Sequence, residues 1–208
     1  MTSKPKDSPG PSRAENARDH ARFLGAFVKG PMKVGAIAPS SPWLAERMAE
    51  EMGLRDARTV VELGPGTGVF TRAICDRVSP EALVMAVEIN PEMALLLADR
   101  FPRVRVVNDS AEHLDRHLAA AGRAQADAIL SGLPWAGFSG DLQERLLGAV
   151  LKVLRPGGRF ATFAYTHASW LPPGRGFRRL LESSFRSVMA TRTVWRNLPP
   201  AFVYRCEM

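Results

Sequence analysis

A glycine-rich segment at residues 60–70 limits what this chain can fold into more than any other part of its sequence. It reads VVELGPGTGVF, an apolar run that leads into three glycines at alternate positions. Because glycine lacks a Cβ atom and tolerates positive φ, a ligand can lie directly against the backbone of such a turn. The amides that open a following helix would face that ligand with the positive end of the helix dipole. The segment therefore predicts a buried strand, a ligand-binding turn and a helix.

Two acidic residues are placed to complete this turn. Glu62 ends the first expected strand, and Glu88 follows Gly68 by 20 residues, at the tip of the next strand. An acidic residue at about that separation suits the hydroxyl pair of a ribose in a nucleotide-binding fold. A dinucleotide site would have the spacing G-x-G-x-x-G, which Val69 breaks, and the spacing here is E-x-G-x-G-x-G. An ordinary tight turn between a strand and a helix is the alternative interpretation.

Strands and helices alternate along the rest of the chain. Seven strands are predicted at residues 59–63, 82–87, 103–107, 126–130, 159–165, 187–194 and 202–206. Helices are predicted at residues 43–52, 70–78, 91–101, 111–121, 141–154 and 176–185. Such alternation indicates an α/β fold, with a mostly parallel sheet, right-handed crossovers and helices on both faces.

Two further strand ends carry candidate binding residues. Open α/β sheets bind ligands at their carboxyl edge, so the first four strand ends should converge on one ligand. The third strand leads into residues 108–110 (NDS), where Asp109 can accept a hydrogen bond from an adenine amine or simply cap the next helix. The fourth leads into residues 131–135 (SGLPW), which can project carbonyls and an aromatic face toward a ligand at this edge, or form a structural turn.

These four elements, in this order, resemble the core of the class I S-adenosylmethionine (SAM) methyltransferases over about residues 59–165. The resemblance implies a Rossmann-like fold, a seven-stranded and mostly parallel sheet flanked by helices, SAM as the cofactor and no metal ion. It assigns cofactor binding to Glu62, Gly64, Pro65, Gly66, Thr67, Gly68, Glu88, Ile89, Asp109, Ser110, Ser131, Gly132 and Leu133.

Within that class, two families resemble different parts of the chain. Residues 132–135 (GLPW) resemble the N-L-P-Y element of the rRNA adenine dimethylases, except that Gly132 replaces the Asn that would bind the target amine. Nearly the whole chain after residue 12 is similar to the bacterial phospholipid N-methyltransferases, through residues 33–41 (KVGAIAPSS) and 194–201 (VWRNLPPA) among others. That family methylates phosphatidylethanolamine stepwise to phosphatidylcholine, which implies an aminophospholipid substrate. Ornithine-lipid methyltransferases are similar enough to leave the head group open.

Four residues are candidates for contact with an amine acceptor. Methyl transfer to an amine is an in-line displacement, so catalysis can rest on positioning and on burial that disfavours the charged amine. Trp135 and Tyr165 are predicted to be catalytic, as aromatic walls that contact the methylated ammonium. Arg196, beside Asn197, is predicted to bind the lipid phosphate. Core packing for Trp135, a strand edge for Tyr165 and a surface charge for Arg196 are the alternatives.

Three histidines are considered as candidates for metal binding or proton transfer. His113 and His117 are four residues apart on one expected helix, as in some metal sites. No third ligand lies near them in sequence, so a solvated helix face is favoured over a metal site. His167, two residues after Tyr165, is a candidate to relay a proton near the amine.

Positive charge is concentrated at the two ends of the chain. Residues 1–33 hold seven Lys or Arg against three Asp or Glu, residues 172–208 hold seven against two, and the remainder has a net charge of −2. This distribution implies an anionic partner such as a membrane surface or a nucleic acid, with solubilising surface charge as the alternative. No apolar run approaches the roughly 20 residues that span a bilayer, and the two cysteines form no framework. We therefore expect a cytoplasmic protein that associates peripherally with membranes.

The N-terminal part of the chain divides into a tail and a helix. Residues 1–12, rich in Pro and Ser, are expected to be a disordered tail. Residues 13–29 carry apolar residues at helical spacing with basic residues mostly off that stripe, which predicts a basic amphipathic helix. Such a helix can lie in a membrane interface or cap the core, and the family resemblance implies that it docks on an anionic membrane. Residues 13–42 thus comprise this helix and a loop that covers the cofactor, and residues 43–208 the methyltransferase domain.

The predicted function is SAM-dependent N-methylation of an aminolipid head group. RNA base methylation is one alternative, in which the basic ends would grip phosphates. The missing Asn and a length of 208 residues, which leaves little room for an RNA-binding appendage, make a nucleic-acid partner the less favoured choice. Methylation of a small metabolite or a protein is the other alternative, and it would make the N-terminal helix a lid without affinity for lipid.

Overall fold

The structure is a computed structural model of the chain, and it describes residues 40–208. The expected tail at residues 1–12 and nearly all of the expected helix and loop at residues 13–42 lie outside the described residues. What the sequence indicates for those segments stays a prediction.

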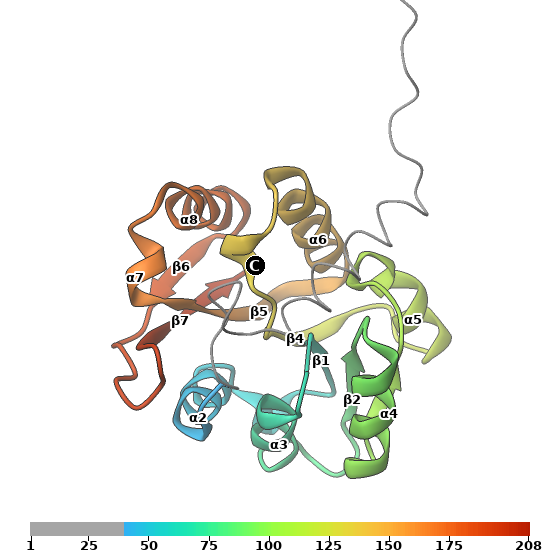
Figure 1. The fold of residues 1–208 in the computed structure, drawn as a ribbon. Helices are drawn as coiled ribbons and strands as arrows, with labels where there is room; N and C mark the ends of the chain where they lie inside the picture. The colour runs from blue at the N-terminus through green and yellow to red at the C-terminus, as the bar shows by residue number, and fades with distance from the viewer. Residues whose placement is uncertain (1–39) are drawn as a thin grey trace, which may run out of the picture. The chain divides into compact units, whose positions relative to one another are not determined.

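A seven-stranded sheet in the order β3-β2-β1-β4-β5-β7-β6 forms the centre of the described part (Figure 1). Its strands are β1 (Thr59–Leu63), β2 (Leu83–Val87), β3 (Arg105–Val107), β4 (Ala126–Ser131), β5 (Leu154–Tyr165), β6 (Ser187–Ala190) and β7 (Ala201–Glu207). Strands β1 to β5 pair in parallel, and β7 runs antiparallel to β5 and β6. Because β1 lies between β2 and β4, the strand order reverses there, which is where such sheets bind ligands. The predicted mostly parallel α/β sheet is confirmed.

Helices cover both faces of this sheet (Figure 1). One face carries α2 (Pro42–Glu50), α3 (Val69–Cys75) and α4 (Pro91–Arg100), and the other carries α5 (Leu114–Ala120), α6 (Gly140–Val153) and α8 (Pro172–Ser184). A short helix, α7 (Thr166–Ser169), joins β5 to α8, and 3-10 turns occur at η1 (Leu54–Asp56), η2 (Ala111–His113) and η3 (Trp135–Gly137). Within residues 40–208, no helix has the length and apolar character that a membrane crossing requires.

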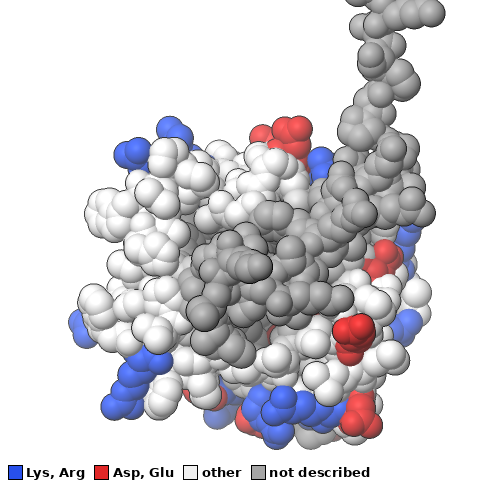
Figure 2. Space-filling view, in the orientation of Figure 1, with Lys and Arg blue, Asp and Glu red and all other residues white. Residues whose placement is uncertain are grey.

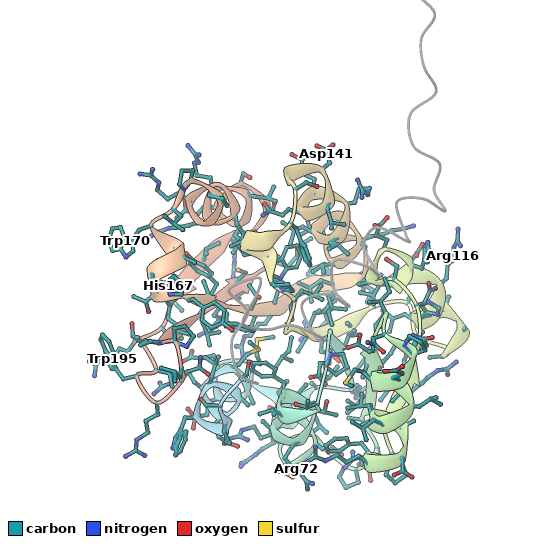
Figure 3. All side chains as sticks on the ribbon, viewed as in Figure 1. Arg72, Arg116, Asp141, His167, Trp170 and Trp195 are labelled. Carbon is teal, nitrogen blue, oxygen red and sulfur yellow. The ribbon has the colours of Figure 1, made fainter. Side chains whose placement is uncertain are left out.

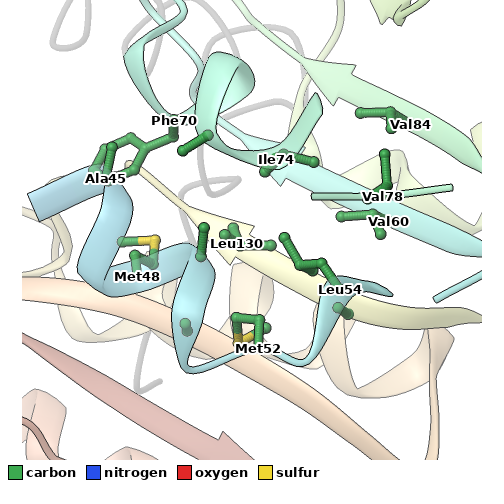
Figure 4. Close-up of a cluster of buried hydrophobic side chains, with 14 of the residues drawn as sticks. Ala45, Met48, Met52, Leu54, Val60, Phe70, Ile74, Val78, Val84 and Leu130 are labelled. Carbon is green, nitrogen blue, oxygen red and sulfur yellow. The ribbon is translucent and has the colours of Figure 1, made fainter. Parts of the chain in front are cut away.

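The core on the first of these faces comes from helix positions that the sequence spaces for burial. Leu44 and Met48 of α2, and Phe70 and Ile74 of α3, are buried in one cluster together with Val60 of β1. Figure 4 shows Met48, Phe70, Ile74 and Val60 of this cluster. Residues four apart lie on the same side of a helix, so each helix turns one apolar side toward the sheet. This packing fixes α3, and with it the turn that precedes α3, relative to the strands.

Several element boundaries differ from the predictions by four or five residues. Helix α8 begins at Pro172 rather than at residue 176, because the fixed φ of proline suits the first turn of a helix. The helix expected at residues 111–121 is divided into η2 and α5. Strand β6 ends at Ala190, after which the chain makes only an isolated bridge to β7, and β5 begins at Leu154, across a register shift against β4.

Candidate active site

Backbone hydrogen bonds join the ends of β1, β2, β3 and β4 into one edge. Gly64 N–H donates to the last residue of β2 at 2.9 Å, and Gly132 N–H donates to the last residue of β1 at 2.8 Å. Glu88 N–H donates to the last residue of β3 at 2.9 Å. The four strand ends that the sequence predicts to converge therefore lie together.

The three glycines of the turn after β1 have positive φ but different surroundings. Their φ angles are 66° at Gly64, 51° at Gly66 and 84° at Gly68. A Cβ atom on Gly64 would lie 2.6 Å from Leu133 Cδ2, and one on Gly68 would lie 2.5 Å from Phe101 Cε2. A Cβ atom on Gly66 would meet no atom of residues 40–208 within 4 Å. Gly64 and Gly68 thus permit close packing, whereas Gly66 leaves the backbone open to a ligand.

The other two residues of this turn, Pro65 and Thr67, contribute through their carbonyl groups. Pro65 is buried and its carbonyl accepts a hydrogen bond from Gly68 N–H at 2.9 Å, which closes the turn. Thr67 is exposed, and its carbonyl accepts a hydrogen bond from Arg100 Nη1 at 2.9 Å. The turn is thus held from within and from α4.

Glu62 places a buried carboxyl group at the end of β1. Its Oε2 accepts a hydrogen bond from Thr71 Oγ1 of α3 at 2.6 Å, while its Oε1 is buried and has no hydrogen-bond partner among the described residues. Burial raises the pKa of Glu62 to about 8, so the carboxyl is mostly protonated at neutral pH. An unsatisfied buried acceptor, two residues before the glycine turn, suits the N–H donor of a cationic ligand.

Glu88 is aimed at the open part of the same turn. Its Oε2 accepts a hydrogen bond from Gly66 N–H at 3.2 Å and its Oε1 one from Asn90 N–H at 2.9 Å. Asn108 Nδ2 donates to Glu88 O at 2.8 Å, which ties the end of β3 to the end of β2. Burial raises the pKa of this carboxyl, against the effect of its hydrogen bonds. Glu88 and its half-buried neighbour Ile89 thus lie beside the glycine turn, and the predicted ribose contact stays a prediction.

Asp109 is held by three neighbours at the end of β3. Its Oδ1 accepts a hydrogen bond from Ser110 N–H at 2.7 Å, and its Oδ2 lies 3.1 Å from His113 Nδ1 and 2.7 Å from His117 Nε2. Partial burial acts to raise the pKa of Asp109, but these hydrogen bonds outweigh it and hold the pKa below its ordinary value. The two histidines are therefore partners of Asp109, a role that the solvated-face interpretation missed. Among residues 40–208, no His, Cys, Asp and Glu side chains are grouped to hold a metal ion.

The segment after β4 packs directly on the glycine turn. Ser131 is buried, and its Oγ accepts hydrogen bonds from Leu133 N–H at 3.3 Å and from the indole N–H of Trp135 at 2.9 Å. A Cβ atom on Gly132 would lie 2.6 Å from Gly64 O. Any side chain at position 132 would collide with this backbone, which gives a physical reason for the departure from the dimethylase element.

Trp135 lies in the core rather than beside an acceptor. Its side chain is 2% exposed, stacks on Phe177 of α8 with ring centroids 4.9 Å apart, and meets Phe160 edge-on at 6.0 Å. The predicted cation–π contact with a methylated amine is not supported by this position, because neighbouring side chains cover the ring. The core-packing alternative applies, and Trp135 connects the segment after β4 to α8.

Tyr165 stands at the carboxyl end of β5 and is partly exposed. Its ring meets Phe163 edge-on at 5.3 Å and lies nearly parallel to the ring of His167 at 6.0 Å. Burial raises the pKa of the Tyr165 phenol, so the O–H group stays neutral and can donate. The rings of Phe163, Tyr165 and His167, at alternate positions, lie side by side at this edge and form an aromatic wall that a cation can contact.

Arg196 and Asn197, although adjacent, lie in opposite environments. Asn197 is 3% exposed, and its Oδ1 accepts a hydrogen bond from Ser41 N–H at 2.9 Å while its Nδ2 donates to Pro199 O at 2.7 Å. One polar group of Asn197 thus binds the start of α2 and the other binds within the β6–β7 connection, so this position does not support the predicted substrate-binding role. Arg196 is exposed, with its guanidinium 5.3 Å from the ring centroid of Trp43.

The donors and acceptors at this edge fit the chemical groups of SAM. Gly66 leaves space for the nucleoside, and Glu88 and Asp109 provide hydrogen-bond acceptors at two strand ends. Glu62 Oε1 is a further acceptor, without a donor among the described residues. The sequence interpretation missed Thr71 and Asn108, which hold these acidic residues in place. A polar residue at the buried side of α3 is the signal that identifies Thr71 in retrospect.

Two methyltransferases that were solved with S-adenosylhomocysteine have the same fold as this chain. An O-methyltransferase from Bacillus cereus, solved with S-adenosylhomocysteine, matches with a TM-score of 0.64 and 16% identity over 96% of this chain and 93% of its own. The 1,6-didemethyltoxoflavin-N1-methyltransferase of Burkholderia thailandensis matches with a TM-score of 0.63 and 21% identity over 98% and 93% of the two chains. At 21% identity or less, these likenesses show that the chain has the Rossmann-like fold of these two methyltransferases.

Sequence relatives narrow this class. A family model described as a methyltransferase domain matches residues 60–158. The ornithine lipid N-methyltransferase of Singulisphaera acidiphila is 38% identical over 193 residues, which cover 91% of this chain and 96% of the relative. The ribosomal RNA small subunit methyltransferase A of Nocardia farcinica is 40% identical over 97 residues, but these cover only 43% of this chain and 31% of the relative. The chain belongs to the class I SAM-dependent methyltransferases, in one family with the lipid N-methyltransferase, and SAM is its cofactor.

Proposed function

We propose that this protein transfers methyl groups from SAM to the amine of an aminolipid head group. The observation that carries the proposal is the similarity to a lipid N-methyltransferase over 91% of the chain. A match over 91% of the chain extends beyond the cofactor-binding strands β1–β4 into the part that follows them, where an acceptor would be selected. The rRNA methyltransferase match covers less than half of the chain.

Two acceptors share the chemistry that this proposal needs. Phosphatidylethanolamine and ornithine lipid each present a primary amine that can be methylated in steps. The resemblance to the phospholipid N-methyltransferases favours phosphatidylethanolamine, with phosphatidylcholine as the final product. The relative from Singulisphaera acidiphila favours ornithine lipid. The amine on a membrane lipid is common to both, and it defines the proposed substrate class.

The residues at the edge of the sheet support direct transfer. When bound, SAM supplies an electrophilic methyl group on a sulfonium, so the amine nitrogen gains a C–N bond as the S–C bond breaks. Tyr165, beside Phe163 and His167, offers rings that stabilise a cationic nitrogen. An amine must be neutral to attack, and a partly buried aromatic wall disfavours its charged form. The proton then leaves to water or through His167.

Methylation of an RNA base has less physical support. In the dimethylase element an Asn binds the target amine, and here a side chain at Gly132 would collide with Gly64 O at 2.6 Å. The chain would thus need another group to hold a base amine. The basic segment at residues 13–29 serves equally well for an anionic membrane, where we propose that the protein works as a peripheral enzyme of the cytoplasm.

Product analysis tests this proposal directly. The protein is incubated with methyl-labelled SAM and mixed micelles that contain phosphatidylethanolamine, ornithine lipid or phosphatidylglycerol, which lacks an amine, and the lipids are separated by thin-layer chromatography. We expect label in one of the two aminolipids and none in phosphatidylglycerol. Label in added ribosomal RNA, with none in either aminolipid, would overturn the proposal. Tyr165→Phe is expected to slow lipid turnover while it leaves SAM affinity unchanged.

A further inference from the structure

A groove of about 790 Å³ lies between α7, α8 and the strands β6 and β7. It is at the end of the sheet farthest from β3 and three strands from the glycine turn. No residue assigned above to the cofactor or the acceptor is part of its described lining. Strand β6 runs parallel to β5, so the end of β6 at Ala190 opens at the same edge of the sheet as Tyr165. The groove is therefore a separate feature that faces the same side of the molecule as the active site.

Helix α8 lines this groove with arginines. Arg175, Arg178, Arg179 and Glu182 lie at helical spacings of three and four on the side of α8 opposite to the buried Phe177 and Leu181. Arg178 Nε pairs with Glu182 Oε1 at 2.8 Å. Neither Arg175 nor Arg179 forms an ion pair with any residue in the described range 40–208. The groove thus contains two guanidinium groups whose charge the described residues do not neutralise.

Neutral hydrogen-bond donors accompany these charges. Thr166, one of the lining residues, has a buried Oγ1 without a hydrogen-bond partner among the described residues. The phenol of Tyr204 also lines the groove, and burial raises its pKa, so it remains an O–H donor. Guanidinium groups together with hydroxyl donors are the set that binds a phosphate oxyanion. The lining is therefore suited to an anion rather than to an apolar ligand.

Exposed apolar side chains stand at the rim of the groove. Trp170 is 76% exposed and Leu171 is 54% exposed, at the junction of α7 and α8. This junction is tightly packed, because a Cβ atom on Gly174 would lie 2.3 Å from Ala168 O. Trp170 and Trp195 project from the same side of the molecule in Figure 3, with His167 between them. In Figure 2 that side is mostly free of charge, with Lys and Arg at its margins.

We propose that this groove binds the phosphate of an anionic membrane phospholipid while Trp170 and Leu171 enter the interface of the bilayer. Tryptophan favours the boundary between lipid and water, and basic residues beside it are attracted to anionic head groups. Single-stranded RNA would use a cationic track with rings for base stacking, whereas the cations here lie within one groove beside aliphatic and aromatic side chains. Binding at this place would hold the carboxyl edge of the sheet, with Tyr165, against the membrane.

A vesicle-binding experiment with a charge-matched control tests the proposal. The full-length protein, the groove variant Arg175→Gln/Arg179→Gln and the control variant Arg116→Gln/Arg123→Gln are floated with phosphatidylcholine vesicles that contain 30 mol% phosphatidylglycerol. Both variants lose two positive charges, and Arg116 lies on the side of the molecule opposite to Trp170 in Figure 3. We expect the groove variant to lose roughly 30-fold in partition, at about fivefold for each arginine at the membrane surface. The control should lose less than about threefold, because salt screens charges far from the surface.

Four outcomes would overturn the proposal. Equal losses in the two variants would assign binding to net charge, and unchanged binding of the groove variant would remove the groove from it. A groove variant that loses binding to a single-stranded RNA but not to vesicles would assign the groove to nucleic acid. Inorganic phosphate at 10 mM should compete only weakly, and complete displacement of the protein from vesicles would indicate a site for free phosphate. Unchanged affinity for SAM shows that the variants are folded.

Trp170→Ala provides a second test that leaves the charge unchanged. We expect weaker binding to the anionic vesicles and the loss of the blue shift in tryptophan fluorescence that accompanies insertion. Retention of that blue shift in Trp170→Ala would show that other tryptophans make the contact. These measurements involve no methyl transfer, so their failure would leave the proposed aminolipid substrate unaffected, and a negative result in the micelle assay would leave the groove unaffected.

Discussion

The two halves of the sheet differ in how deeply their candidate functional residues are buried. In the half formed by β1–β4, Glu62, Glu88 and Ser131 are buried, and internal hydrogen bonds fix their positions. In the half formed by β5–β7 with α7 and α8, Trp170 and Trp195 are each 76% exposed. A preorganised interior suits a cofactor of constant shape, whereas an exposed surface suits the membrane lipid that we propose as the acceptor. The first half can be tested through stability and the second through binding.

Substitution of the buried and the exposed tryptophans tests this contrast with the largest expected effect. Trp135→Ala should lower the free energy of unfolding by about 3–5 kcal/mol, because it empties a site between Phe160 and Phe177 and leaves Ser131 without its indole partner. Urea unfolding measures this loss. Trp195→Ala is the control and should change stability by less than about 0.5 kcal/mol. A comparable loss in both variants would contradict the division between interior and surface.

Glu62 predicts an unusual dependence of stability on pH. Its pKa in the folded protein, about 8, lies above the ordinary value of 4.5. The stability that its protonated form contributes is fully present below pH 4.5 and is lost as the pH rises through 8. Without SAM, the protein should lose about 2–3 kcal/mol of stability between pH 6 and pH 9 relative to Glu62→Gln. Parallel pH profiles of the two proteins in urea unfolding would refute the raised pKa.

The same carboxyl should titrate when SAM binds. If the unsatisfied Oε1 of Glu62 accepts a hydrogen bond from a cationic group of the cofactor, the carboxylate becomes favoured and its proton is released. Calorimetry of SAM binding at pH 7, in buffers of different ionisation enthalpy, should detect release of a substantial part of one proton. Glu62→Gln should bind SAM more weakly and release none.

The sequence predicts the first half of the molecule better than the second. The spacing of Gly64, Gly66 and Gly68 after an apolar run identifies a turn at the carboxyl edge, because few other arrangements need three glycines there. Trp135 was assigned to the acceptor from its place after β4, but its burial depends on α8, which is distant in sequence. The burial of Asn197 likewise depends on a distant partner, because Ser41 lies 156 residues away. Local patterns specify strand ends, whereas side-chain direction depends on long-range packing.

Two substitutions within the glycine turn distinguish a glycine needed for packing from one needed for ligand access. Their expected losses of stability are intermediate. Gly68→Ala should destabilise the protein by about 1–3 kcal/mol, because its Cβ atom would lie 2.5 Å from Phe101. The Cβ atom of Gly66→Ala meets no atom of the described part of the chain, so the substitution should cost about 1 kcal/mol from the positive φ alone. It should lower SAM affinity more strongly. Thermal unfolding and calorimetric titration with SAM provide the two readouts. Equal stability losses in the two variants would argue against separate roles.

The smallest expected effects distinguish the neighbours Arg196 and Asn197. Asn197→Ala should lower the free energy of unfolding by about 1–3 kcal/mol, since it leaves the buried N–H of Ser41 without its acceptor. Arg196→Ala removes only an exposed contact with Trp43 and should cost no more than about 1 kcal/mol. Urea unfolding compares the two variants, and methyl transfer to lipid in micelles is measured on both. If Arg196 contacts an anionic group of the lipid, Arg196→Ala should raise the KM for lipid while its stability stays near that of the unmodified protein. An unchanged KM would show that Arg196 is a surface charge without a role in lipid binding.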